Sequence, residues 1–172
     1  GKILGKEEVE ELTDELDRVI RDRDHGDRDQ PVLLRNFARE EGKLVWQIVD
    51  IWRASDPFRK LVFHPEIARV AAGLSGATEL RIWHDQIQYK VESIGGVNMW
   101  HQDSPAWQVL RPKDAQITAW IALDDVDEDN GCMSMVAGTH RLGTQTEALK
   151  TVEDFHSLPE TVEGVNIKPE LR

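Results

Sequence analysis

The feature that most constrains the fold is a change in hydrophobic periodicity near Thr78. Before this residue, apolar side chains recur at the three- and four-residue spacing of an amphipathic helix. After it, they alternate with polar side chains, as in a half-buried strand. The change predicts an α+β chain with helices first and antiparallel strands behind, built around a mainly β core.

Three helical segments are expected before Thr78. The first runs from Glu7 to about Asp22 and is followed by a solvated loop of mixed charge. Its apolar stripe consists of Val9, Leu12, Leu16 and Ile20. The second is expected from about Glu40 to Ala54, and the third from Pro65 to Gly76. Proline at the start and glycine at the end are the usual boundaries of a helix.

Three strands are expected after the change, at Thr78–Lys90, Gln116–Leu123 and Cys132–Val136. Period-two alternation and β-branched or aromatic residues support them. An acidic turn at 124–131 leads into the third strand, and a turn at 137–140 follows it.

Composition excludes several classes of function. The formal net charge of -11 opposes nucleic-acid binding, which requires clustered Lys and Arg. The single cysteine, Cys132, cannot form an internal disulfide and fits a reducing, cytoplasmic location. There is no apolar run near the roughly 18 residues of a membrane span and no signal-peptide pattern, so a soluble protein is expected. The sequence does not indicate an oligomeric state.

The triplet His101-Gln102-Asp103 is the central candidate for chemistry. On an extended backbone, residues two apart point to the same face, so the imidazole and the carboxylate can converge on one cation. Two histidines and one carboxylate on one face of an octahedral metal are typical of non-heme Fe(II) oxygenases. The alternative is a histidine that merely hydrogen-bonds a nearby carboxylate, because such triplets are common by chance.

The stretch from Gln86 to Gly143 resembles the phytanoyl-CoA dioxygenase family in the order, spacing and type of its residues. The resemblance rests on Gln86-Ile-Gln-Tyr-Lys90, Gly95-Gly96, Trp100-His101-Gln102-Asp103, Thr118-Ala-Trp120-Ile-Ala-Leu-Asp124-Asp125, Asn130-Gly131-Cys132 and Gly138-Thr139-His140. It implies a double-stranded β-helix, or jelly roll, with N-terminal helices packed on it. We therefore expect one oxygenase domain over residues 1–172, with a helical lead-in over 1–77 and the first part of the jelly roll over 78–172.

The resemblance also implies an activity. Fe(II) is expected to bind His101 and Asp103, with 2-oxoglutarate and O2 as cosubstrates. Oxidative decarboxylation of 2-oxoglutarate to succinate would be coupled to hydroxylation of an unactivated C–H bond in a small molecule. Related halogenases replace the carboxylate by a small residue, whereas this chain keeps Asp103, so hydroxylation is expected.

The same resemblance assigns residues to 2-oxoglutarate and substrate. Gln86 and Lys90 lie four apart on one expected strand and would face the same way, and Thr118 and Trp120 would join them at the cosubstrate. The alternative for Lys90 is a solvent-exposed strand residue, and for Trp120 it is an ordinary core ring. Trp107, in the segment after Asp103, is the candidate for the substrate pocket.

The family pattern continues to a distal histidine, the third iron ligand, and to an arginine for the far carboxylate of 2-oxoglutarate. After Asp103 the histidines are His140 and His156, and neither has the surrounding pattern of that ligand; Arg172 lacks the context of the arginine. We therefore expect the C-terminal strands to be missing from this sequence. The alternative function is a non-catalytic jelly-roll binding domain with an incomplete metal site.

Overall fold

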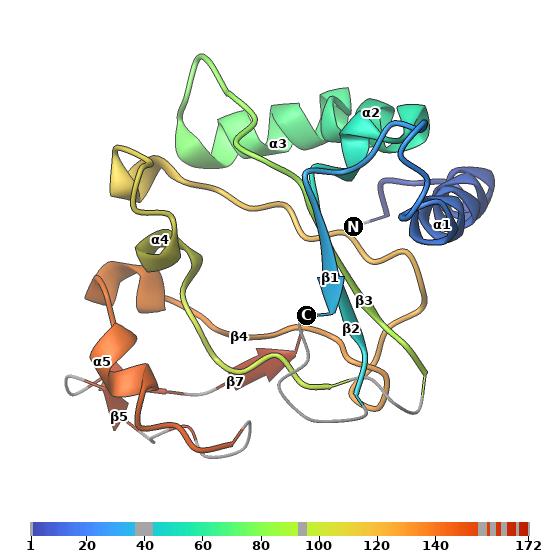
Figure 1. Cartoon of the computed structure of the whole chain (residues 1–172). Helices are drawn as coiled ribbons and strands as arrows, with labels where there is room; N and C mark the ends of the chain where they lie inside the picture. The colour runs from blue at the N-terminus through green and yellow to red at the C-terminus, as the bar shows by residue number, and fades with distance from the viewer. Residues whose placement is uncertain are drawn as a thin grey trace. The chain divides into compact units, whose positions relative to one another are not determined.

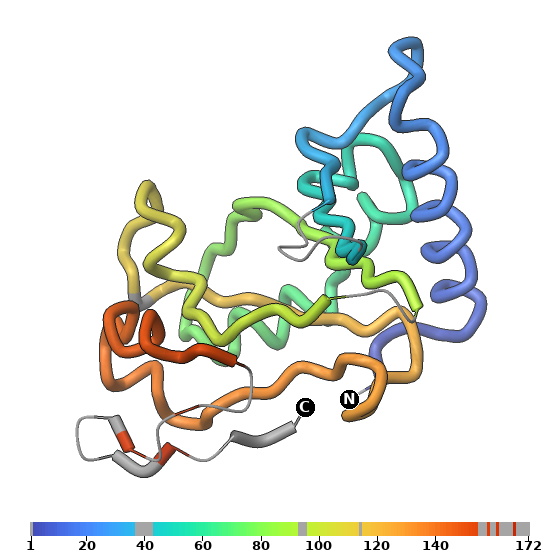
Figure 2. Tube along the Cα trace, turned by 60° about the horizontal axis from the view of Figure 1, so that its bottom comes forward, coloured from blue at the N-terminus to red at the C-terminus, as the bar shows by residue number. Residues whose placement is uncertain are grey.

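The computed structural model describes residues 2–36, 43–92, 96–154, 158, 161–162, 165–167 and 169–171. These residues form two compact units. The N-terminal unit comprises Gly1–Gly96 and Ile117–Asp124, and the C-terminal unit comprises Val97–Gln116 and Asp125–Arg172. The path of the chain through both can be followed in Figure 2.

The first helix, α1 (Lys6–Arg21), forms where the apolar stripe predicts it. At its N-terminus Glu8 forms the glutamate half of a capping box, because the Gly5 backbone N–H donates to Glu8 Oε2 at 2.7 Å. One face buries Leu12 and Leu16 against the rest of the N-terminal unit. The first helical prediction is confirmed.

A three-stranded antiparallel sheet is the centre of the N-terminal unit (Figure 1). Its strands, in spatial order, are β1 (Leu33–Asn36), β2 (Val45–Val49) and β3 (Gln86–Lys90). Ile48 of β2 pairs with Ile87 of β3, and Ile48 is fully buried. One face of the sheet therefore packs against the core to which α1 also contributes.

The prediction of a helix from Glu40 to Ala54 is wrong. Of its residues, 40–42 lie outside the described part of the chain, Val45–Val49 form β2, and Ile51–Arg53 form a short 3-10 turn, η1. Apolar residues in this stretch fit both periods, and β2 has a partner strand on each side. Two backbone ladders and its β-branched residues favour the strand over the isolated helix.

Two helices follow η1 directly, and only the second of them was predicted. Ser55 caps α2 (Asp56–Val62), because its hydroxyl accepts from the Phe58 backbone N–H. The next helix, α3 (Pro65–Ser75), ends at Gly76 in the left-handed conformation, as predicted. None of the helices in the described residues has the length and hydropathy that a bilayer span requires.

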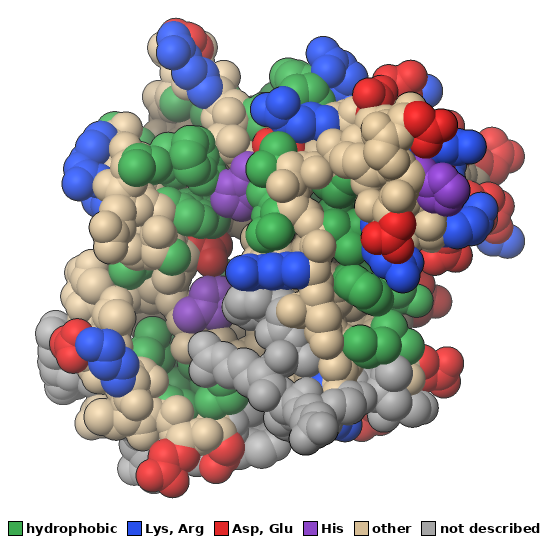
Figure 3. Space-filling model, in the orientation of Figure 1, with side chains coloured by type: hydrophobic (Ala, Val, Ile, Leu, Met, Phe, Trp, Pro, Cys, Tyr) green, Lys and Arg blue, Asp and Glu red, His purple; other side chains and the backbone are tan. Residues whose placement is uncertain are grey.

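Two predicted strands of the N-terminal unit are shorter or absent. The strand expected at Thr78–Lys90 begins only at Gln86, and Gln116–Leu123 runs without strand pairing. Ile121 and Leu123 nevertheless pack against the core, so burial without a partner strand fixes that segment. Figure 3 shows that hydrophobic side chains also reach the surface, among charged ones.

The C-terminal unit consists of short elements. Its helical turns are α4 (Asp103–Ala106), η2 (Lys113–Ala115), η3 (Thr139–Leu142) and α5 (Thr146–Leu149). Its strands are β4 (Ser134–Val136), β5 (Thr161–Val162), β6 (Val165–Asn166) and β7 (Pro169–Leu171), paired as β4 with β7 and β5 with β6. The predicted strand Cys132–Val136 thus exists from Ser134 onward.

The α+β class predicted from the periodicity is confirmed, but the mainly β core is not. The strands of the described residues form one three-stranded sheet and two two-stranded ones. Ladders this short and separate do not make a recognisable jelly roll within that part of the chain.

Candidate functional site

His101 and Asp103 converge in the C-terminal unit. His101 Nε2 lies 3.4 Å from Asp103 Oδ1, and the two side chains are 65% and 42% exposed. The extended backbone assumed for the triplet ends early, because Asp103 already begins α4. Gln102 is extended, with φ -117° and ψ 135°. One extended residue is enough to turn its two neighbours to the same side, as the spacing predicts.

A backbone carbonyl orients the His101 ring. Nδ1 of His101 lies 2.7 Å from the carbonyl oxygen of Met99. Because a carbonyl only accepts, Nδ1 carries the proton, and Nε2 is the nitrogen that faces Asp103. The hydrogen bond to Asp103 is the main cause that raises the pKa of His101 above its usual value, and burial opposes it.

This arrangement fits a divalent cation. Histidine ligands of metals commonly donate their other ring N–H to a backbone carbonyl, which fixes the tautomer. In His101 that donation leaves Nε2 directed at the carboxylate. A cation held by Nε2 and Oδ1 would replace the proton that the charged imidazole donates to the carboxylate. One histidine and one carboxylate are two of the three ligands in an Fe(II) facial triad, so the pair is a candidate for two of those positions.

The third ligand is not assembled in the described residues. No group of three or more His, Cys, Asp or Glu side chains there could hold a metal ion. His140 lies in η3 and does not complete such a group with His101 and Asp103. His156 and Arg172 lie outside the described residues.

The residues predicted to bind 2-oxoglutarate lie in the N-terminal unit. Gln86 and Lys90 share one face of β3, while Ile87 and Tyr89 on the other face pack against the core. The predicted site residues therefore form two sets. One set, in the N-terminal unit, consists of Gln86, Lys90, Thr118 and Trp120, and the other, in the C-terminal unit, consists of His101, Asp103 and Trp107.

Gln86 belongs to a hydrogen-bonded row across the sheet. Its Oε1 accepts from Gln47 Nε2 at 3.0 Å, and Gln47 Oε1 accepts from Arg35 Nε at 2.9 Å. Each strand contributes one side chain, so the row gives this face a polar surface to which Arg35 adds a positive charge. No sequence signal pointed to Gln47 or Arg35, because a helix was predicted across β2 and the strand pairing was therefore not expected.

Thr118 and Trp120 lie in the segment of the N-terminal unit that was predicted as a strand. The Trp120 ring is 45% exposed, which contradicts the alternative of a plain core ring. Their predicted common face depended on strand alternation, and the segment does not form a strand.

Trp107 ends α4 in the C-terminal unit and begins the loop that follows the His101–Asp103 pair. Lys113 closes this loop, because its Nζ donates to the carbonyl oxygens of Ser104 at 2.7 Å and Trp107 at 2.5 Å. Burial is the first cause that lowers the pKa of Lys113. The segment 104–113 is therefore folded on itself around one ammonium group.

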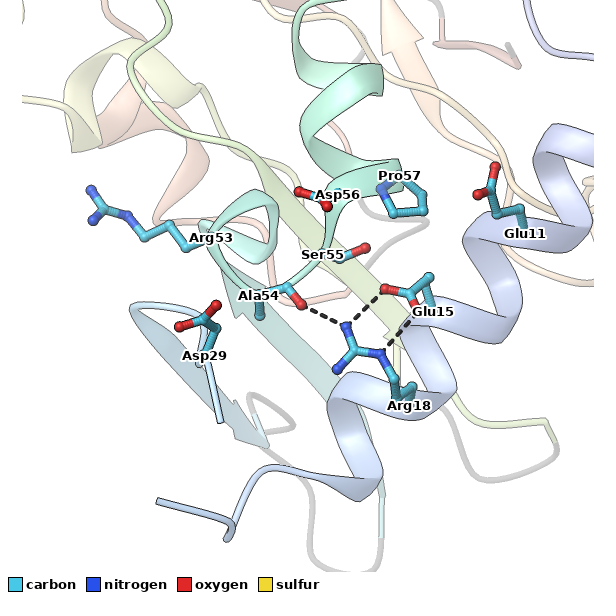
Figure 4. Close-up of a pocket in the computed structure, with 9 residues that line it drawn as sticks. All are labelled: Glu11, Glu15, Arg18, Asp29, Arg53, Ala54, Ser55, Asp56 and Pro57. Carbon is cyan, nitrogen blue, oxygen red and sulfur yellow. Dashed lines mark hydrogen bonds and ion pairs between the residues drawn. The ribbon is translucent and has the colours of Figure 1, made fainter. Parts of the chain in front are cut away.

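A surface pocket of about 420 Å³ lies in the N-terminal unit and includes none of the predicted site residues (Figure 4). Arg18 of α1 crosses it, with hydrogen bonds to Glu15 at 2.9 and 2.8 Å and to the Ala54 carbonyl at 2.5 Å. The bond from Arg18 is also the main cause that lowers the pKa of Glu15. Because Arg18 binds both Glu15 and the Ala54 carbonyl, it links α1 to the turn that precedes α2.

Comparison with known proteins places both sets of candidates in one family match. The profile of the family described as "Phytanoyl-CoA dioxygenase (PhyH)" matches residues 2–163, which include every residue of both sets. This chain belongs to the phytanoyl-CoA dioxygenase family. The family implies a double-stranded β-helix and typically uses Fe(II) and 2-oxoglutarate, as the resemblance of the motifs predicts.

Three relatives illustrate the range of the family. A phytanoyl-CoA dioxygenase domain-containing protein 1 homolog from Caenorhabditis briggsae is 33% identical over 87 residues, which are 50% of this chain and 30% of the relative. The peroxisomal phytanoyl-CoA dioxygenase of Bos taurus is 26% identical over 143 residues, 81% of this chain and 39% of the relative. The ectoine dioxygenase of Bordetella parapertussis is 28% identical over 144 residues, 81% of this chain and 44% of the relative.

The chain thus spans less than half the length of these curated relatives. No solved structure matches it significantly. Family membership therefore rests on sequence, and the geometry of the His101–Asp103 pair is an independent observation on the same residues.

Proposed function

We propose that this chain carries part of the active site of an Fe(II)- and 2-oxoglutarate-dependent oxygenase that hydroxylates a C–H bond of a small molecule. The observation that carries the proposal is the 3.4 Å approach of His101 Nε2 to Asp103 Oδ1, with Nδ1 fixed by the Met99 carbonyl. Bound Fe(II) would supply the activation of O2 that is coupled to decarboxylation of 2-oxoglutarate. The jelly-roll arrangement of the complete domain belongs to the same proposal.

Each residue of the pair would have a separate task. His101 would bind the cation through Nε2, a neutral donor whose direction the Met99 carbonyl holds. Asp103 would bind through a carboxylate oxygen and offset part of the cation's charge. Because both side chains are partly exposed, the site is open to solutes.

The residues on the N-terminal unit would bind the cosubstrate. Lys90 supplies a cation, and Gln86, held by Gln47, supplies an amide, as partners for a carboxylate. Thr118 and Trp120 would provide a hydroxyl and an exposed ring beside the cosubstrate, and Trp107 would line the substrate pocket. The relatives' names specify phytanoyl-CoA and ectoine, which are both small molecules. This supports a small-molecule substrate for this chain.

The experiment replaces one carboxylate. Asp103→Ala removes a proposed ligand, and Asp129→Ala removes an exposed carboxylate of the acidic turn in the same unit. We expect Asp103→Ala to weaken Co(II) binding by at least about 100-fold and to abolish Fe(II)-dependent consumption of 2-oxoglutarate, while Asp129→Ala behaves as the unaltered chain.

Co(II) titration by visible absorption reports on the metal ligands separately from turnover. If Asp103→Ala bound Co(II) and consumed 2-oxoglutarate normally, the metal assignment would be wrong. Co(II) binding without 2-oxoglutarate consumption by the unaltered chain would favour the alternative, a binding domain with an incomplete metal site.

A further inference from the structure

The side chain of Gln102 holds a distant segment of the C-terminal unit. Its Nε2 donates to the carbonyl oxygen of Gly143 at 3.0 Å. Its Oε1 accepts from the backbone N–H of Gln145 at 2.6 Å. The partly buried Gln102 amide thus uses its donor and its acceptor on backbone groups two residues apart.

This pattern imitates a strand ladder. A strand residue binds a neighbouring strand through one N–H and one C=O, and the Gln102 side chain presents the same pair to the segment 143–145. A glutamate would keep the acceptor and lose the donor, and a leucine would lose both. Gln102 therefore binds that segment through a donor and an acceptor that only a primary amide of this length provides together.

The segment itself is shaped to receive the amide. Gly143 has φ 68° and ψ -151°, in the region that glycine alone adopts without strain. Gln145 donates in turn from Nε2 to the Leu142 carbonyl at 2.7 Å, which closes the turn. The acceptor and the donor for Gln102 are thus held in position before it binds.

The direction of the Gln102 side chain relates this contact to the His101–Asp103 pair. Successive side chains of an extended backbone point to opposite sides, so Gln102 points away from the side on which His101 and Asp103 converge. Its two hydrogen bonds fix the backbone between the two proposed ligands. The pair is otherwise solvent-exposed, and neither residue lies in a strand.

We propose that Gln102 is a positioning residue, which keeps His101 Nε2 and Asp103 Oδ1 close together by binding the backbone of residues 143–145. This inference rests on the proposed metal site. Freed from that contact, the residue can leave the extended conformation, and the imidazole and the carboxylate then separate. The unbound chain would have to restore that geometry each time a cation binds, which lowers the affinity.

The experiment compares three glutamine variants of the whole chain by Co(II) titration. Gln102→Leu removes both hydrogen bonds, Gln102→Glu retains the acceptor, and Gln108→Leu is the control on an exposed glutamine of the same unit. We expect a loss of Co(II) affinity of about 10- to 100-fold for Gln102→Leu, a smaller loss for Gln102→Glu and none for Gln108→Leu.

Amide hydrogen exchange of the metal-free chain provides a second readout. The Gln145 N–H should exchange faster in Gln102→Leu than in Gln102→Glu, because the glutamate still accepts its hydrogen bond. If Gln102→Leu does not fold, as judged by circular dichroism, Gln102→Glu carries the comparison with the unaltered chain.

The outcomes separate this proposal from the proposed function. Unchanged Co(II) affinity in the folded Gln102 variants, together with lost binding in His101→Ala, would overturn the positioning role and leave the metal site standing. Equal Co(II) binding by His101→Ala and the unaltered chain would overturn the metal site, and the positioning role with it. A Co(II) affinity that is lowest in Gln102→Leu, intermediate in Gln102→Glu and highest in the unaltered chain would support both proposals.

Discussion

The two units are stabilised in different ways. All the buried apolar side chains of the described residues belong to the N-terminal unit, where α1, the sheet and α2 share one core. The described part of the C-terminal unit has no buried apolar side chain and instead shows many bonds from side chains to backbone. The first unit is held by hydrophobic burial, and the second by polar contacts of fixed direction.

The acidic turn shows the second kind of stabilisation. Asp127 Oδ1 accepts from the backbone N–H groups of Asp129 and Asn130 at 2.9 and 3.1 Å. Asn130 returns the contact, accepting from the Asp127 N–H at 2.8 Å. Such contacts specify local geometry but contribute little to global stability, because each replaces a bond to water. Side chains such as those of His101 and Asp103 can be oriented by contacts of this kind without a core.

The largest expected effect is in the N-terminal core. Phe58 of α2 is 1% exposed and lies in the cluster that joins α1 and the sheet. Phe58→Ala leaves a cavity, and we expect it to lower the free energy of unfolding by about 3–5 kcal/mol. Urea denaturation followed by circular dichroism measures the change.

Phe63 provides the matched control. It ends α2 and is 60% exposed, so Phe63→Ala should change the free energy of unfolding by less than about 1 kcal/mol. If the two substitutions had equal effects, burial would not be what stabilises this unit, and the contrast with the C-terminal unit would be lost.

The next effect concerns a carboxylate in the N-terminal unit. Burial, and then the charge of Asp50, raises the pKa of Asp85 from 3.8 to about 6. Oδ1 of both residues is buried without a hydrogen-bond partner among the described residues. The folded chain therefore binds a proton more tightly than the unfolded chain, and the free energy of unfolding should fall as the pH rises from about 4 to about 6.

Asp85→Asn tests that pH dependence. An amide cannot ionise, so the fall between pH 4 and 6 should disappear, and the variant should be more stable than the unaltered chain at pH 8 by about 1–2 kcal/mol. Asp14→Asn, on the exposed face of α1, is the control and should leave the profile unchanged. If the free energy of unfolding of Asp85→Asn still fell between pH 4 and 6, the proton released there would belong to a group other than Asp85.

The sequence predicted best what depends on local chemistry. The stripe of α1, the Pro65 and Gly76 boundaries of α3 and the convergence of His101 with Asp103 all follow from short-range geometry. The α+β class follows from the same periodicities.

The failures concern partners that are distant in the chain. Whether 45–49 is helix or strand depends on β1 and β3, which pair with it from either side. The contacts of Gln102 with residues 143 and 145 cross about forty positions and have no periodic signal. A pattern within one segment contains no information about the backbone groups of another.

The smallest effect on stability is expected at Lys113, in the C-terminal unit. Lys113→Met keeps the length of the side chain and removes the donor to the Ser104 and Trp107 carbonyls. Because no core depends on these bonds, the urea midpoint should stay within the error of the unaltered chain, while amides of the segment 104–113 exchange several-fold faster. Lys150→Met, which breaks only a surface pair with Glu147, is the charge-matched control. A large fall in the urea midpoint for Lys113→Met would show that this unit shares the cooperative stability of the other, and that polar contacts of this kind support more than local geometry.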